Sequence, residues 1–149
     1  MRLVLDTVVA SELRRARTGK ADPAFAAWAE AISLSQAYLS VVTLHEIEVG
    51  CLLTARKDPT RALVYSTWLA DLAQAFEGRI IDVTRPIASA AAAYHVPDPA
   101  PFADALIGAT AASLNAAIAT RNVTDFARFG LPVVNPWDPD GDRPSAGTP

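Results

Sequence analysis

The chain has 149 residues, of which 51% are hydrophobic and 19% are charged, and its formal net charge is −3. This composition excludes an intrinsically disordered chain, and no apolar stretch reaches the roughly 18 residues that a membrane span needs. Because Cys51 is the only cysteine and no spacing of Cys and His indicates a zinc site, we expect a cytoplasmic protein without a disulfide.

Strands and helices alternate along the chain, as hydrophobic periodicity and the Gly and Pro breaks indicate. Asp22 and Pro23 are typical of a helix N-terminus, Pro101 suits the first turn of another helix, and Gly78 ends a third. In chain order, we predict a strand over residues 2–5, helices over 8–16 and 23–35, a strand over 38–42, helices over 43–55 and 60–76, a strand over 79–83, helices over 86–94 and 101–114, and strands over 116–120 and 131–135. We expect turns rather than a regular element over 122–130.

Alternation on this scale predicts the α/β class, with a mostly parallel sheet of about five strands between two helical layers, an α/β/α sandwich. We expect one domain over residues 1–137 and a disordered tail over the Pro- and Asp-rich residues 138–149. Binding sites in open parallel sheets lie at the carboxyl ends of the strands. A functional site is therefore expected where the predicted strands end.

Four carboxylates occupy such positions. Asp6 directly follows the first strand, and Glu46 lies one turn into the helix after the second strand. Asp104 is in the first turn of the sixth predicted helix, and Asp125 comes shortly after the fourth strand. Each has a purely structural alternative. Asp6 and Asp125 can cap local turns, and the helix dipole favours Asp104 at its position. Glu46 completes a capping box that begins at Thr43.

Taken together, the four acids predict a cation site, because neighbouring carboxylates repel one another unless a cation compensates. Oxygen ligands suit Mg²⁺ and Mn²⁺, whereas zinc favours His and Cys. Two such ions about 4 Å apart can activate a water and stabilise the leaving oxygen of a phosphodiester. A stripe of small residues predicts close packing of the sixth helix on the sheet, which would hold Asp104 at its edge. The stripe comprises Ala105, Gly108, Ala109 and Ala112.

Five segments, in order along the chain, match a known family pattern. They are residues 3–7 with 11–13, residues 39–46 with Gly50, residues 102–107, residues 119–126 and residues 134–137. Through these segments the chain resembles the PIN-domain ribonucleases, in particular the VapC-like toxins of bacterial type II toxin–antitoxin modules. The resemblance implies a PIN-like α/β/α sandwich and an endoribonuclease toxin that hydrolyses RNA phosphodiesters by metal-activated water.

The resemblance also assigns roles to residues. It implies that Asp6 and Asp104 are the principal ligands of Mg²⁺ or Mn²⁺. Glu46 would orient a water or a second ion, and Asp125 would complete the catalytic set. The implied supporting residues are Thr7, Thr120 and Asn122. The implied partners are an RNA substrate, a second copy of the chain in a homodimer, and a small antitoxin whose C-terminal segment enters the acidic groove.

One position departs from the family pattern. Val8 stands where the family commonly has Asn, so an amide near the site is missing. A catalytically weak or inactive PIN-fold binding module therefore remains an alternative. A receiver-type signalling domain also places an aspartate at a strand end, but it needs a lysine near the last strands, and the only lysines here are Lys20 and Lys57.

The densest basic run, Arg14, Arg15 and Arg17 with Lys20, follows the acidic strand end by about two helical turns. These residues can steer RNA phosphates toward the metal site. Alternatively, they form the solvated end of a helix, where basic residues complement the dipole. A second basic run over residues 56–61 is interpreted as solvated surface.

Overall fold

The central element is a sheet in which all neighbouring strands run parallel, in the order β3-β2-β1-β4-β5. The structure, a computed structural model, describes residues 1–138. Its strands are β1 (Leu3–Leu5), β2 (Ala37–Ser40), β3 (Ile80–Ile81), β4 (Ala117–Ala119) and β5 (Val133–Val134). Its helices are α1 (Thr7–Arg17), α2 (Pro23–Ala31), the short 3-10 helix η1 (Leu34–Gln36), α3 (Val41–Ala55), α4 (Pro59–Ala75), α5 (Arg85–Ala93), α6 (Phe102–Ser113) and α7 (Val123–Ala127). The predicted α/β sandwich with about five strands is confirmed. The predicted tail from residue 138 onward lies, apart from Asp138, outside the described residues.

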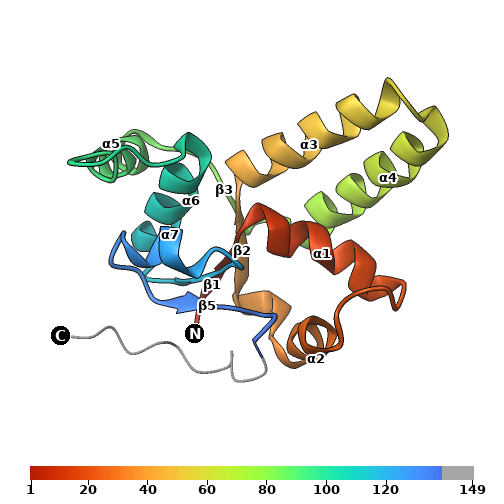
Figure 1. Ribbon diagram of the computed structural model, residues 1–149, viewed down its shortest axis with the longest axis horizontal. Helices are drawn as coiled ribbons and strands as arrows, with labels where there is room; N and C mark the ends of the chain where they lie inside the picture. Colours follow the sequence, from red (N-terminus) through yellow and green to blue (C-terminus); the bar gives the residue numbers. More distant parts are fainter. Residues whose placement is uncertain (139–149) are drawn as a thin grey trace.

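Helices cover both faces of the sheet because its strands are apolar at nearly every position, the main exception being Ser40 at the end of β2. Leu3 and Leu5 of β1 point to one face and Val4 to the other, since side chains alternate along a strand. Leu3 and Leu5 belong to a core cluster with residues of α1, α2, α3 and α4. Val4 packs instead in a cluster with Ile107 of α6 and Phe126 of α7. Figure 1 shows the two layers, with α1–α4 on one side of the sheet and α5–α7 on the other.

The strand order reverses at β1. The chain moves from β1 outward through β2 to β3, and then returns to place β4 and β5 on the opposite side of β1. Such a reversal leaves a crevice beyond the carboxyl ends of the two strands between which it occurs. Asp6 follows β1 and Thr120 follows β4 directly, so these two side chains flank the crevice.

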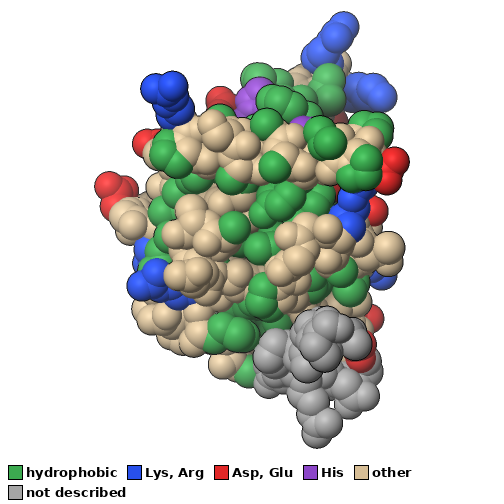
Figure 2. Space-filling view, turned by 90° about the vertical axis from the view of Figure 1, so that its left-hand side faces the viewer, with side chains coloured by type: hydrophobic (Ala, Val, Ile, Leu, Met, Phe, Trp, Pro, Cys, Tyr) green, Lys and Arg blue, Asp and Glu red, His purple; other side chains and the backbone are tan. Residues whose placement is uncertain are grey.

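The helical layers differ in shape. Helices α3 and α4 form a hairpin that projects away from the sheet (Figure 1), and its base is held by the buried side chains of Ile47 and Trp68. The opposite layer is more compact. Figure 2 looks onto this side and shows hydrophobic side chains gathered over its centre, with Lys and Arg mainly at the rim. Within residues 1–138, no helix combines the length and the apolar character that crossing a bilayer requires.

One predicted helix end and one predicted turn segment are wrong for local reasons. The helix predicted over 23–35 ends at Ala31, because Ile32 is extended and the hydroxyls of Ser33 and Ser35 bond to each other at 2.8 Å. The segment predicted as turns over 122–130 contains α7, which is anchored by the fully buried Phe126.

The small-residue stripe of α6 does not face the sheet as predicted. Ala105 and Ala109 pack against α5, and Ala112 is exposed. Gly108 is the position where size matters, because a Cβ there would lie 3.0 Å from a ring carbon of Phe129. The small residues of α6 therefore pack mainly against α5 and the segment after α7, whereas the larger Ile107 packs against Val4 of the sheet.

Candidate metal and phosphodiester site

Asp6 both caps a helix and reaches across the crevice. Its Oδ1 accepts a hydrogen bond of 2.6 Å from the backbone N–H of Thr7, and its Oδ2 accepts one of 2.7 Å from the hydroxyl of Thr120. The side chain is buried, with 5% of the residue exposed. Burial raises the pKa of Asp6, and the hydrogen bond from Thr120 opposes this rise. Asp6 can therefore cap α1 and belong to the site at the same time, because one carboxylate oxygen binds the start of α1 and the other binds Thr120.

Glu46 does not cap its own helix, so the predicted capping box is wrong. Helix α3 begins at Val41, two residues earlier than predicted, because the Ser40 hydroxyl accepts from the N–H of Val42 at 3.1 Å. Glu46 then lies in the second turn, where its carboxylate accepts a hydrogen bond of 2.6 Å from the Thr7 hydroxyl. This contact ties α3 to the start of α1 beside Asp6.

Asp104 is the residue at which the four carboxylates are linked electrostatically. It is half-buried in the first turn of α6. Burial is the largest cause that raises the pKa of Asp104 to about 6, and the negative charges of Asp6, Asp125 and Glu46 contribute the rest of the rise. Asp125, exposed in the first turn of α7, thus acts on Asp104 through charge. The structure brings all four predicted acids into one electrostatic neighbourhood.

The polar residues predicted to support the site organise it through hydrogen bonds. The hydroxyl of Thr120, fully buried, donates to Asp6 and accepts from the backbone N–H of Asn122 at 3.0 Å. Asn122 precedes α7, and its side chain makes no capping hydrogen bond. Thr7 connects to Glu46, and its Oγ1 also lies 3.3 Å from that of Thr43. Thr43, predicted as an N-cap, is instead a buried residue in contact with Thr7.

Within residues 1–138, no basic side chain forms an ion pair with these acids. The ion pairs between side chains in residues 1–138 join Arg15 to Glu12 and Arg17 to Asp71, and neither pair includes a predicted site acid. Carboxylate oxygens without a basic partner match the donor set that Mg²⁺ and Mn²⁺ prefer. No group of three or more Asp, Glu, His or Cys side chains in the described part of the chain is arranged to hold an ion.

A hollow of about 400 Å³ opens beside the acids, between α1, α3 and α4. Thr7, Val8 and Glu46 line one part of it. Arg14 lines it farther along α1, and Tyr65 lines it from α4. We call this space the site hollow. Val8, 47% exposed, presents an apolar surface to it where the family commonly has an amide.

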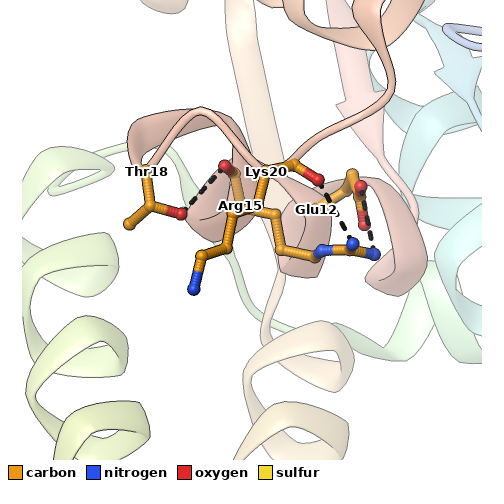
Figure 3. Close-up of polar contacts among 4 residues, drawn as sticks. All are labelled: Glu12, Arg15, Thr18 and Lys20. Carbon is orange, nitrogen blue, oxygen red and sulfur yellow. Dashed lines mark hydrogen bonds and ion pairs between the residues drawn. The ribbon is translucent and has the colours of Figure 1, made fainter.

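The three arginines predicted to steer RNA have different surroundings. Arg15 lies at the C-terminal end of α1 with its guanidinium nitrogens 3.7 Å from the Glu12 carboxylate and 3.2 Å from the Lys20 carbonyl (Figure 3). Arg17 lies 3.9 Å from the carboxylate of Asp71 and does not line the site hollow. Arg14 lines the site hollow and forms no ion pair within residues 1–138.

The charge of Asp104 is expected to cost stability when no cation is bound. The folded state binds a proton at Asp104 more tightly than the unfolded state, so this contribution to stability falls as pH rises from about 4 to about 6. With solvent screening of a half-exposed group, Asp104→Asn should raise the free energy of unfolding at neutral pH by on the order of 1 kcal/mol. Urea unfolding in chelator measures this, and the gain should vanish below about pH 4. An equal gain at both pH values would contradict the assignment.

The comparisons with known proteins agree with this geometry. The PIN domain family matches residues 3–131 of the chain. The VapC ribonuclease Y4jK of Sinorhizobium fredii is 33% identical over 143 residues, which cover 92% of this chain and 99% of that protein. The solved structure of FitAcB from Neisseria gonorrhoeae is 28% identical with a TM-score of 0.81, covering 91% of this chain and 98% of its own. A toxin–antitoxin complex from Klebsiella pneumoniae is 28% identical with a TM-score of 0.60, over the same shares of the two chains. The family match covers most of the chain and agrees with the parallel sheet and the converging acids. The chain therefore belongs to the PIN domain family.

Proposed function

We propose that this chain is an endoribonuclease toxin of a toxin–antitoxin module and that it hydrolyses RNA phosphodiesters with a metal-activated water. The observation that carries the proposal is the gathering of the acids at one edge of the sheet, where hydrogen bonds tie Asp6 to Thr120 and Glu46 to Thr7. Consistent with this, burial and then the charges of Asp6, Asp125 and Glu46 raise the pKa of Asp104. At neutral pH a carboxyl group with a pKa of about 6 is largely ionised, so these acids concentrate negative charge that a bound cation would compensate. The relative from Sinorhizobium fredii, named a VapC ribonuclease, supports RNA as the substrate class.

We infer that Mg²⁺ or Mn²⁺ is the cofactor, held principally by Asp6 and Asp104. A divalent ion at such a site lowers the pKa of a bound water and stabilises the charge on a phosphodiester oxygen. The protein's own contribution is orientation. Thr120 fixes one oxygen of Asp6 from the strand β4, Thr7 fixes Glu46, and the short helix α7 presents Asp125 from the opposite layer.

The proposed partners are an antitoxin and a second copy of this chain. The similarity to a chain of a toxin–antitoxin complex supports the antitoxin. The acidic end of the site hollow suits a basic side chain from such a partner, because Glu46, which lines it, forms no ion pair within residues 1–138. Light scattering of the purified chain measures whether a dimer forms.

An inactive binding module is the competing function, and Val8 in the site hollow is the observation that favours it. Cleavage of cellular RNA by the purified protein decides between the two. We expect cleavage with Mg²⁺ or Mn²⁺ and none in excess EDTA. Calorimetric titration with Mn²⁺ reports binding independently of turnover. A folded protein that binds no Mn²⁺ and leaves RNA intact would overturn the nuclease proposal in favour of the inactive module.

A further inference from the structure

A second hollow has a volume of about 620 Å³, and we call it the basic hollow. Arg14 and Arg15 of α1, Lys20 after α1, and Arg61 and Tyr65 of α4 line it. Arg14, Arg15 and Tyr65 line the site hollow as well. The two hollows therefore adjoin and form one path, acidic at one end and basic at the other.

Tyr65 organises the positive charges of the basic hollow. The guanidinium carbon of Arg14 lies 4.4 Å from the centroid of the Tyr65 ring, and that of Arg61 lies 5.4 Å from it. Arg61 also donates a hydrogen bond of 2.9 Å from its Nε to the Tyr65 hydroxyl. Cations over an aromatic face are attracted to it, so the ring holds two arginines near each other despite their repulsion.

The basic hollow retains a net positive charge. Arg15 is partly neutralised by Glu12 and also bonds the Lys20 carbonyl (Figure 3). Arg14, Lys20 and Arg61 form no ion pair with a carboxylate in residues 1–138. Guanidinium groups held without carboxylate partners suit the paired oxygens of a phosphate.

We propose that the basic hollow is a phosphate subsite for the RNA strand, next to the cleavage site, with Arg14 and Arg61 as its main ligands. This inference rests on the proposed function. Thr7 and Arg14 are seven residues apart on α1, which places their backbones on the order of 10 Å apart. A strand whose scissile phosphate lies at the acids can therefore place a neighbouring phosphate between the two arginines. An acidic peptide is the less suitable ligand, because it has no phosphodiester to place at the acidic end of the path.

Binding in EDTA separates this subsite from catalysis. A fluorescent single-stranded RNA oligonucleotide is titrated with wild type, Arg14→Ala, Arg61→Ala and the control Arg56→Ala, which removes an arginine at the C-terminal end of α3 outside both hollows. Each subsite variant should lower the slope of log affinity against log salt by about 0.7 and weaken binding roughly tenfold at low salt. Arg56→Ala should retain the wild-type slope. Equal slopes for all four proteins would overturn the subsite.

Cleavage with Mn²⁺ distinguishes failure of the subsite from failure of the proposed function. The Arg14→Ala and Arg61→Ala variants should lower kcat/KM for the long RNA about tenfold and leave kcat/KM for a dinucleotide unchanged, because a dinucleotide does not reach the basic hollow. Equal losses on both substrates would overturn the subsite but not the nuclease. A wild-type protein that cleaves neither substrate would overturn the proposed function. Tighter binding of oligoglutamate than of RNA, lost in the same variants, would assign the basic hollow to an acidic protein instead.

Tyr65 is assigned as a positioning residue, and its conservative variant tests that role. Tyr65→Phe keeps the ring beneath Arg14 and removes the hydroxyl that accepts from Arg61. Tyr65→Phe should therefore lower the slope of log affinity against log salt by the same amount as Arg61→Ala. The double variant Tyr65→Phe/Arg61→Ala should lower this slope no further than Arg61→Ala alone. Additive losses in the double variant would contradict positioning through Arg61.

Discussion

Asp104→Asn is expected to lower the rate of metal-dependent RNA cleavage by roughly 10³-fold, a loss of about 4 kcal/mol of transition-state stabilisation. Asp104 is the acid on which the other three charges act, and the neutral amide binds a divalent ion weakly. Single-turnover cleavage with saturating Mn²⁺ measures the rate. The same substitution should relieve the growth arrest that expression of the active toxin is expected to cause.

Asp82→Asn provides the matched control for that loss. Asp82 also follows a strand directly, but the strand is β3 at the edge of the sheet, and Asp82 is exposed. Its charge is not among those that raise the pKa of Asp104. We expect cleavage at the wild-type rate. Equal rates for the Asp104 and Asp82 variants would contradict the assignment of Asp104 as a metal ligand.

Thr120→Val should both destabilise the fold and slow cleavage. The variant has nearly the same shape, but it leaves a buried oxygen of Asp6 without its donor and the Asn122 N–H without its acceptor. A missing hydrogen bond to a buried polar group costs about 1–3 kcal/mol, and more when the group is charged. The loss of the Thr120 donor also raises the pKa of Asp6 further, so a higher Mn²⁺ concentration should be needed for half-maximal rate.

Thr110→Val controls for the removal of a buried hydroxyl as such. Thr110 is as fully buried as Thr120, but its hydroxyl donates to the Leu106 carbonyl of its own helix. That carbonyl retains its place in the helix, so the expected loss of stability is below about 1 kcal/mol. Chemical unfolding gives both values. Equal destabilisation by the two variants would show that the Thr120–Asp6 contact has no special weight.

The sequence was sufficient to predict the class of fold and the meeting of the four acids. Asp6 and Glu46 follow adjacent parallel strands, and such strands bring their carboxyl ends to one edge of a sheet. The periodic apolar pattern determines which segments are strands, so the convergence follows from topology. It does not require knowledge of any side-chain contact.

The helix starts were less predictable, because competing hydroxyl groups decide them. Both Ser40 and Thr43 are favourable N-cap residues. A cap at Thr43 places Glu46 in the first turn of the helix, whereas the observed cap at Ser40 places it in the second turn. The β-branched pair after Ser40 also favours a strand by propensity, yet in the structure these residues begin α3. Tertiary contact between Thr7 and Glu46 accompanies the earlier start.

The contacts of the basic residues could not be predicted from the sequence for a related reason. A run of like charges in the sequence indicates an exposed surface, but it does not show which residues each charged side chain will contact. Arg17 meets Asp71 of α4, while Arg61, interpreted as solvated, bonds Tyr65 four residues later on its own helix. The Arg61 and Tyr65 spacing was visible in the sequence as neighbours on one helical face. Their common contact with Arg14 was not.

The pairing of β1 with β4 has a consequence for synthesis of the chain. Leu3 lies opposite Ala117, and Thr120, which completes the surroundings of Asp6, comes just after β4. A chain growing on the ribosome exposes its first strand long before either partner exists. A product of translation that stops before β4 therefore lacks both the strand that pairs with β1 and the hydroxyl that holds Asp6, so we expect it to have no nuclease activity.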